Sequence, residues 1–397
     1  MTKFKDQQNK TGLARRLDDL VAKASRKTPQ SSLVLAVDHP DVAYLWEPLG
    51  SQTQLGPSVS FSEQNNLSPQ YHTASIGKLF TLELILQLID QGRLTLTTKV
   101  KEVVPNLGLE ELWAEGDKSM VDDLTIEHLL THTSGIPDYF SGIMDQTPKS
   151  SNLFRTKKNK TNGGTEPILD QVINYPESYW TPEQIFDWVK QAASNPTQPG
   201  NRFDYSDTGY LILGFIAEAL GGKDYGDLLK EQIFDPAGMT GSHLAFPHRD
   251  SSVVLPPILP FFIQGRELSR AKSLSCDWAG GGVITTGSDL LKFNQWFWAK
   301  SNQPVRSRLT NTINHRFRSG IGYGLGIMEL RLGEFSWLLK GFPQFYGHLG
   351  VTATHLWYEP KSKLSIALNL GDTRRMRESF ILLIQLVIAF KREGLIW

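Results

Sequence analysis

The chain has 397 residues, 40% hydrophobic and 21% charged, which is the composition of a globular protein able to bury a large core without disulfides or metals. Lys and Arg together number 41, as do Asp and Glu, so the formal net charge is zero and gives no reason to expect nucleic acid or an anionic membrane as a partner. The single cysteine, Cys276, cannot form a disulfide within the chain, which fits a reducing compartment.

No segment is typical of a targeting signal or a membrane span. Residues 1–20 contain no apolar core of the kind found in secretory signals. The longest apolar run, Ile381–Phe390, is interrupted by Gln385 and is too short to cross a bilayer. We therefore expect a cytoplasmic protein with no membrane partner, unless an export signal has been removed.

The amino-terminal part of the chain combines helix and strand patterns. Apolar residues at helical spacing predict a helix over 12–25, and an apolar run predicts a strand over 32–38. A polar, turn-rich stretch follows to about residue 70. The segment 75–91 is apolar nearly all round, which is typical of a buried helix, and Gly92 is its natural stop.

The middle of the chain is mainly helical in pattern. A short helix is expected over 125–134, between a threonine cap and a closing glycine. Residues from about 145 to 180 are polar and basic, which predicts a mobile excursion over the surface. Thr181 and Gln184 form a capping box that opens the next helix. Further helices are predicted at 208–220, 225–234, 288–299 and 376–392.

Strand patterns return towards the carboxyl end, so strands occur near both ends of the chain and helices dominate between them. This arrangement predicts one sheet assembled from both ends, with a helical region inserted. The late strands are expected at 282–285, 322–331, 335–340, 351–358 and 364–370.

Ser75 and Lys78 form the sharpest local signal. Residues three apart lie on the same helix face, here at the start of an apolar helix. A serine hydroxyl needs a base to become a good nucleophile, and a lysine amine shielded from water can have a lowered pKa and serve as that base. The free N–H groups of the helix start can also stabilise an oxyanion. The alternative is coincidence, since Ser-x-x-Lys is a short pattern.

The second signal is Tyr205-Ser206-Asp207, just before the helix predicted at 208–220. A tyrosine close to a lysine ammonium can accept the serine proton and protonate the leaving group. The alternative, which is compatible with this role, is that Ser206 or Asp207 caps the helix.

The third signal is His348-Leu349-Gly350, before the strand predicted from Val351. Gly350 would let the backbone approach a substrate closely, and the N–H of Val351 would be a second oxyanion donor beside that of Ser75. The alternative is a hairpin glycine and a surface histidine.

Taken together and in this order, the three signals resemble the serine β-lactamase and penicillin-binding-protein family, especially class C β-lactamases and related esterases and D-amino-acid peptidases. Connecting segments are also similar to that family, and the resemblance covers roughly residues 30–390. These segments are HLLTHTSGIPD at 128–138, FDYSDTGYLILGFIAEALGG at 203–222, AGGGVITTGSDLLKF at 279–293 and GYGLGI at 322–327.

The resemblance implies that Ser75 is acylated, while Lys78 and Tyr205 share the proton transfers. Asp207 stands where the class C pattern has asparagine and would line the substrate cleft. His348 stands where a lysine is usual, and Leu349 replaces a small hydroxyl residue.

These departures bear on substrate choice. Lysine and threonine at those positions would grip a substrate carboxylate, whereas His348 offers a weaker, pH-dependent grip and Asp207 would repel the carboxylate. We therefore expect hydrolysis of β-lactams to be weaker than that of esters or amides. The expected substrate-binding residues are therefore Asp207, His348 and Gly350.

The resemblance also implies the fold and the domain organisation. The expected fold is α+β and β-lactamase-like: an antiparallel sheet flanked by amino- and carboxyl-terminal helices, with an inserted mainly helical region. We expect a single catalytic domain over 1–397, in which 1–75 and 280–397 form the α/β region and 76–279 the helical region.

The expected activity is that of a metal-free, cofactor-free serine hydrolase that forms an acyl-enzyme with a carboxylic ester or a D-amino-acid peptide or amide. Its partner is a small-molecule or short-peptide substrate. His128 and His132 have a spacing that could bind metal, but no third ligand is placed nearby, so a structural role is favoured. The alternatives are a β-lactamase or DD-peptidase, and a non-catalytic binding relative of the same fold.

Overall fold

The computed structural model describes residues 2–26, 32–48, 50–54, 68–113, 115–140, 168–191, 197–255 and 257–396. Its centre is a nine-stranded antiparallel sheet in the order β3-β2-β1-β14-β13-β12-β11-β10-β9. The strands are β1 (Val34–His39), β2 (Val42–Glu47), β3 (Gly50–Gln54), β9 (His315–Arg318), β10 (Ile321–Tyr323), β11 (Met328–Leu330), β12 (Phe345–Gly350), β13 (Thr354–Glu359) and β14 (Leu364–Asn369).

Strands from the two ends of the chain meet in the middle of this sheet. β1 pairs with β14, with Val34 opposite Asn369 and Asp38 opposite Ser365. Side chains alternate between the two faces: Leu35 and Val37 pack into one hydrophobic cluster, whereas Val34 and Ala36 pack into another. The sheet is therefore covered on both faces in its central strands, as a run of apolar residues in β1 requires.

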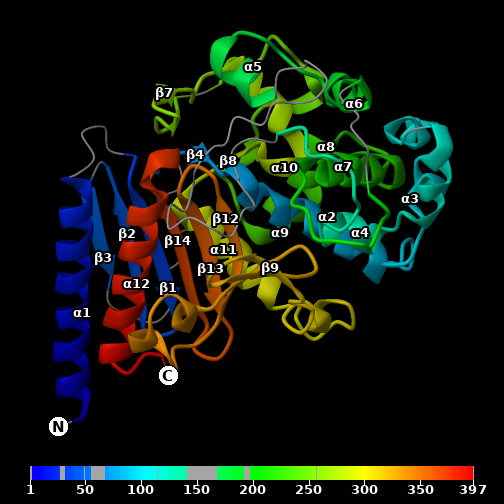
Figure 1. Cartoon of the computed structure of the whole chain (residues 1–397). Coiled ribbons are helices and arrows are strands. Elements are labelled where there is room, and N and C mark those ends of the chain that lie inside the picture. Colours follow the sequence, from blue (N-terminus) through cyan, green and yellow to red (C-terminus); the bar gives the residue numbers. More distant parts are fainter. Residues whose placement is uncertain are drawn as a thin grey trace.

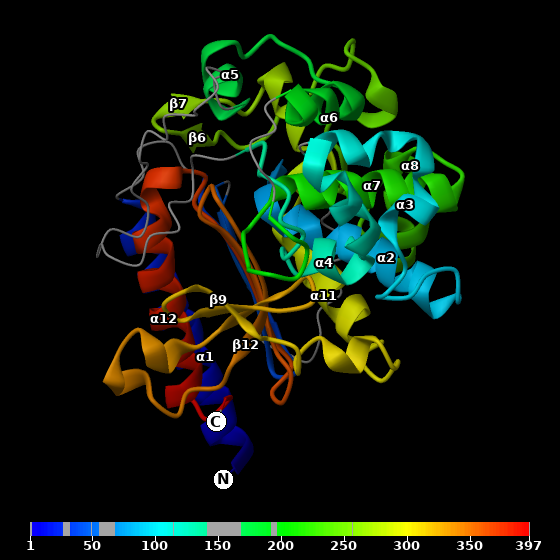
Figure 2. The same cartoon turned by 45° about the vertical axis from the view of Figure 1, so that its right-hand side comes forward.

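Helices α1 (Thr2–Ser25) and α12 (Met376–Arg392) lie side by side on one face of the sheet (Figures 1 and 2). Leu13, Leu17 and Val21 of α1 are fully buried there with Leu383 and Leu386 of α12. The opposite face is covered by α11 (Gly287–Trp298), which packs on β1 and β14.

The helical region lies beyond α11 on that second side (Figure 2). At its centre α2 (Lys78–Asp90) packs against α7 (Asp207–Gly221), and nearly every residue of both helices up to the last turn is buried. The remaining helices are α3 (Val100–Val103), α4 (Ile126–Leu130), α5 (Ile168–Asn174), α6 (Pro182–Gln191), α8 (Tyr225–Leu229), α9 (Asp235–Ala237) and α10 (Trp278–Gly281).

Two small sheets complete the arrangement. The strands β4 (Tyr71–His72) and β5 (His243–Leu244) both pair with β8 (Val283–Thr285), and β6 (Phe262–Ile263) pairs with β7 (Arg266–Glu267). Because β4 ends at His72, three residues before Ser75, the three-stranded sheet anchors the segment that leads into α2.

The α+β fold expected from the sequence is confirmed, and so are the helices at 208–220, 288–299 and 376–392 within one residue at either end. The capping box is also present, because Gln184 N–H donates to Thr181 Oγ1 (3.2 Å) and Thr181 N–H donates to the Gln184 side chain (2.9 Å).

Three expectations were wrong. The stretch after residue 38 is not simply a turn-rich connection, because it contains β2 and β3. The strand expected at 335–340 is absent: Trp337–Leu339 is a 3-10 turn whose apolar side chains are largely exposed, and the strand β12 lies later. The excursion expected from 145 to 180 is not a mobile surface segment at its end, because Ile168–Asn174 forms helix α5 with buried apolar side chains; its part at 145–167 lies outside the described residues.

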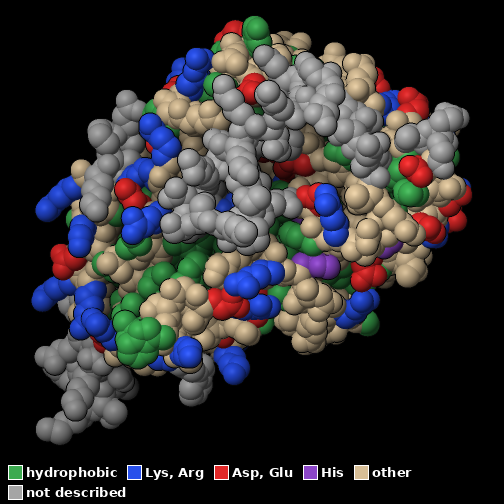
Figure 3. Space-filling model, in the orientation of Figure 1, with side chains coloured by type: hydrophobic (Ala, Val, Ile, Leu, Met, Phe, Trp, Pro, Cys, Tyr) green, Lys and Arg blue, Asp and Glu red, His purple; other side chains and the backbone are tan. Residues whose placement is uncertain are grey.

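On the face shown in Figure 3, acidic and basic side chains of the described residues are interspersed, in keeping with the balanced charge of the chain. No helix among the described residues is both long enough and apolar enough to cross a lipid bilayer.

Candidate active site

Ser75 lies in a 3-10 turn, Ala74–Gly77, that runs directly into α2. The turn packs tightly against α10: a Cβ atom on Gly77 would lie 2.6 Å from Cα of Gly281, so only glycine fits. Ser75 is 8% exposed. The local sequence thus presents one serine hydroxyl at the start of a buried helix.

Lys78 is completely buried beneath Ser75. Its Nζ donates to Ser75 Oγ (3.2 Å) and to the backbone oxygen of Gly280 (2.9 Å), and it forms an ion pair with the Asp207 carboxylate. Burial alone would lower the pKa of Lys78, but Asp207 and Tyr205 outweigh burial and raise that pKa. The expected lowering of the lysine pKa is therefore wrong for the resting site, because the sequence does not reveal that Asp207 reaches Lys78.

Tyr205 faces the same lysine. Its ring centroid lies 5.2 Å from Lys78 Nζ, and its buried hydroxyl is close enough to Ser75 and Lys78 for hydrogen bonding with them to lower its pKa. Burial raises the pKa of Tyr205, and the lowering by Lys78 is smaller, so the phenol keeps its proton. The Tyr205 hydroxyl thus lies beside both Ser75 and Lys78, within reach of a proton transfer between them.

The start of α7 is capped by a residue that the sequence analysis did not select. Neither Ser206 nor Asp207 makes a capping hydrogen bond with its side chain, so the expectation that one of these side chains caps the helix is wrong. Instead Asp138 Oδ1 accepts a hydrogen bond from the N–H of Asp207 (2.8 Å). The Asp207 carboxylate is thereby left to pair with Lys78.

A third carboxylate, Asp277, lies beside Asp207. A Cβ atom on Gly280 would lie 2.9 Å from Asp277 Oδ1, 3.0 Å from Asp207 Oδ1 and 3.6 Å from Lys78 Nζ, so the three ionisable groups surround this glycine. Burial and the neighbouring Asp207 raise the pKa of Asp277 to about 8 despite the opposing effect of Lys78. At neutral pH the Asp277 carboxyl therefore holds its proton.

His348 lies inside β12, fully buried. Its Nδ1 bonds to the backbone oxygen of Leu349 (2.9 Å), and its Nε2 bonds to Tyr323 Oη (3.4 Å). Burial and the charge of Lys78 lower the pKa of His348 to about 3, so the ring is neutral at physiological pH. Two expectations for His348 are therefore wrong: that it lies on the surface, and that it binds a substrate carboxylate in a pH-dependent way.

Gly350 brings the end of β12 against the Ser75 turn. A Cβ atom at this position would lie 2.8 Å from the backbone oxygen of Thr73 and 3.0 Å from Cβ of Ala74. Val351 follows in the turn between β12 and β13, not in a strand, and its N–H donates to no backbone oxygen of the described residues. A free N–H at this point is what an oxyanion donor requires.

The other candidates flagged in the sequence are engaged elsewhere. His128 Nδ1 accepts a hydrogen bond from the N–H of Thr125 (3.3 Å), whereas His132 Nε2 bonds to Tyr323 Oη (2.9 Å). The two rings therefore have different hydrogen-bond partners. Cys276 is buried, and burial raises the pKa of its thiol, which leaves it unreactive.

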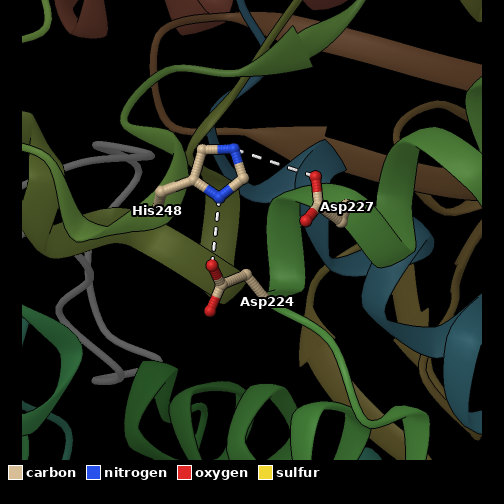
Figure 4. A group of neighbouring side chains, drawn as sticks. All are labelled: Asp224, Asp227 and His248. Carbon is tan, nitrogen blue, oxygen red and sulfur yellow. Dashed lines mark hydrogen bonds and ion pairs between the residues drawn. The ribbon is translucent and has the colours of Figure 1, made fainter.

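Among the described residues, Asp224, Asp227 and His248 form a group whose atoms are close enough to hold a cation (Figure 4). His248 Nδ1 lies 3.0 Å from Asp224 Oδ2, and this hydrogen bond raises the pKa of His248. The guanidinium of Arg249 is also 3.4 Å from Asp224 Oδ1. The three side chains are half exposed and already balanced by positive charge, so they form an ion-pair group on the surface.

The sequence profile of the β-lactamase family matches residues 68–380. The chain belongs to the β-lactamase family. The resemblance expected from the sequence is thus confirmed.

Curated relatives of this β-lactamase-family chain include Penicillin-binding protein 4* of Bacillus subtilis (strain 168), 25% identical over 293 residues, or 69% of this chain and 53% of the relative. D-alanyl-D-alanine-carboxypeptidase/endopeptidase AmpH of Escherichia coli (strain K12) is 25% identical over 267 residues, or 65% of this chain and 59% of the relative. The chain therefore spans little more than half the length of these two proteins.

Two solved structures share the fold over nearly their whole length. D-amino acid amidase from Ochrobactrum anthropi SV3, complexed with L-phenylalanine, superposes with a TM-score of 0.68 at 18% identity, covering 96% of this chain and 99% of the amidase. EstCE1, a hydrolase with promiscuous acyltransferase activity, gives a TM-score of 0.64 at 19% identity and covers 97% and 99% of the two chains.

Proposed function

We propose that this protein is a serine hydrolase that forms an acyl-enzyme on Ser75 with a carboxylic ester or a D-amino-acid peptide or amide. The observation that supports it most is the 3.2 Å contact between Ser75 Oγ and Lys78 Nζ, next to the buried hydroxyl of Tyr205. Nucleophile and proton-transfer groups lie within reach of one another, as acyl transfer requires.

In the proposed acylation, Ser75 Oγ bonds to the substrate carbonyl carbon. Lys78 passes one proton to Asp207 and then accepts the serine proton, and Tyr205 donates its own proton to the leaving oxygen or nitrogen. Asp207 returns a proton through Lys78 to Tyr205, so that the net transfer is from Ser75 to the leaving group. The N–H groups of Ser75 and Val351 are the proposed oxyanion donors.

The test is to map the acyl group. Wild-type protein is mixed with a p-nitrophenyl ester, quenched with acid within the first turnover, digested and analysed by mass spectrometry. We expect the acyl mass on the peptide that contains Ser75. An acyl group on another residue would overturn the nucleophile assignment, and release of p-nitrophenol without any adduct would overturn the acyl-enzyme. If the protein reacts with no ester or amide, the non-catalytic binding relative is the correct function.

The charges at the site support a finer proposal, that the substrate carries a positively charged amine. The Asp207 carboxylate acts on two other acidic side chains, Asp138 and Asp277, and raises the pKa of each, while Lys78 is the cation that opposes both shifts. A substrate carboxylate would find no unpaired cation among these groups, because His348 is neutral and Lys78 is already paired with Asp207. This arrangement disfavours penicillins and cephalosporins and favours amino-acid esters and amides with a free amine.

We therefore expect kcat/KM for D-alanine p-nitroanilide to exceed that for its N-acetyl derivative by about 10-fold or more, equivalent to about 1.4 kcal/mol. Asp277→Asn should reduce this ratio several-fold, because the asparagine amide cannot become an anion when the ammonium binds. Asp187→Asn, which removes an exposed carboxylate on α6, is the control and should leave the ratio unchanged. Equal rates with both substrates, or a ratio unaffected by Asp277→Asn, would contradict the amine preference without affecting the acyl-enzyme.

A further inference from the structure

Behind Tyr205 lies a chain of three buried side chains that the proposed reaction does not use. His132 Nε2 is 2.9 Å from Tyr323 Oη, and Tyr323 Oη is 3.4 Å from His348 Nε2. His132 is 1% exposed and the other two are fully buried. The three residues come from three distant parts of the sequence, so their meeting is a property of the fold.

The backbone partners of the two histidines determine which nitrogen carries the proton. The N–H of Ser206 lies 3.2 Å from His132 Nδ1, and because an amide N–H can only donate, His132 Nδ1 must accept. The backbone oxygen of Leu349 lies 2.9 Å from His348 Nδ1, and because a carbonyl can only accept, His348 Nδ1 must donate.

Both rings are neutral, since burial and the nearby charge of Lys78 lower the pKa of each. His132 therefore carries its proton on Nε2 and donates to Tyr323 Oη. His348 carries its proton on Nδ1, so its Nε2 accepts from the Tyr323 hydroxyl, whose own pKa is raised by burial. The Tyr210 hydroxyl, 3.3 Å from Tyr323 Oη, can only add a second donor there.

The hydrogen bonds thus all run in one direction, from the N–H of Ser206 through the three side chains to the backbone oxygen of Leu349. One end is the segment that carries Tyr205, which His132 holds in two further ways. Its backbone oxygen accepts from the N–H of Asp204 (2.8 Å), and its ring centroid lies 4.1 Å from that of Tyr205. The other end is the strand that leads to Val351.

We propose that His132, Tyr323 and His348 form a one-directional hydrogen-bond chain that positions Tyr205 relative to the end of β12. The chain couples the two backbone segments that flank Ser75 and leaves no buried donor or acceptor of these rings unpaired. The three are positioning residues, since none bonds to Ser75 or Lys78. A lysine in place of His348 could not accept a hydrogen bond from the Tyr323 hydroxyl, so the link between these two positions would have to run in the opposite direction.

The direct test is nitrogen NMR of the unmodified enzyme labelled with ¹⁵N-histidine, measured between pH 6 and 8. The His348 signals are identified by their loss in His348→Gln, and the His132 signals by their loss in His132→Gln. We expect His132 as the Nε2–H form and His348 as the Nδ1–H form, with neither signal titrating. The same tautomer at both sites, or protonation of either ring in this range, would overturn the proposal. This readout does not depend on any hydrolytic activity.

A kinetic test distinguishes positioning from plain stability. Tyr323→Phe keeps the ring but removes its hydrogen bonds to His132 and His348, so we expect kcat to fall about 10-fold with a small change in KM, because Tyr205 is then held less firmly relative to the end of β12. Tyr210→Phe removes only the hydrogen bond between the Tyr210 and Tyr323 hydroxyls and is the matched control. We expect its kcat to be unchanged within about two-fold. Equal losses of kcat in both variants would contradict the proposal, as would a change confined to the melting temperature.

Discussion

Replacing Ser75 by alanine should reduce the turnover of a p-nitrophenyl ester by about 10⁴-fold or more, since the proposed mechanism has no other nucleophile. The substitution removes one hydroxyl from a side chain that is 8% exposed, and its hydrogen-bond partner Lys78 keeps Asp207 and Gly280. Stability should therefore change little. The measurement is the initial rate of p-nitrophenol release by the two proteins at equal concentration.

The matched control is Ser365→Ala in β14. This serine is also buried and its Oγ has no partner in the described part of the chain, so the change removes a hydroxyl away from the site. We expect its rate to equal that of the wild type. If Ser75→Ala and Ser365→Ala retain equal activity, Ser75 is not the nucleophile and the proposed function is wrong.

Replacing Lys78 by methionine should affect both activity and stability. Loss of the proton-transfer group should reduce kcat by about 10²- to 10⁴-fold. The change also leaves the Asp207 carboxylate, 7% exposed, without its cation, and breaking a buried pair from one side costs about 3–5 kcal/mol of unfolding free energy. Urea denaturation followed by circular dichroism measures the second effect.

The double variant Lys78→Met/Asp207→Asn separates these contributions. It removes both charges, so most of the lost stability should return, whereas activity should remain as low as in Lys78→Met. Recovery of activity in the double variant would show that Lys78 serves only to neutralise Asp207. If Lys78→Met is as stable as the wild type, the ion pair between Lys78 and Asp207 contributes nothing to folding.

The sequence predicted those parts of the molecule whose signals are local. Ser75 and Lys78 are one helical turn apart, so their contact follows from helix geometry alone, and the Thr181 cap follows from four consecutive residues. The family resemblance also predicted the fold, because it drew on motifs spread along most of the chain.

Contacts between distant segments were not predictable in this way. Asp277 shows no sign in the sequence of facing Lys78, because its approach depends on the glycines of α10, which let two backbones pack closely. The neutral state of His348 depends on burial that a single strand pattern does not reveal. The exposed Trp337 misled the strand assignment, since hydrophobic patterns indicate strands only where those side chains are buried.

The pairing of β1 with β14 has a consequence for how the protein is made. Val34 and Asn369 are more than 300 residues apart, so the middle of the sheet cannot close until the segment around Asn369 has left the ribosome. Until then β1, apolar on both faces, has no strand partner on that side and is exposed to aggregation. The turn that carries Ser75 packs against β12 and β13, which are made more than 250 residues later, so a nascent chain cannot acquire a complete catalytic centre before these two strands have been synthesised.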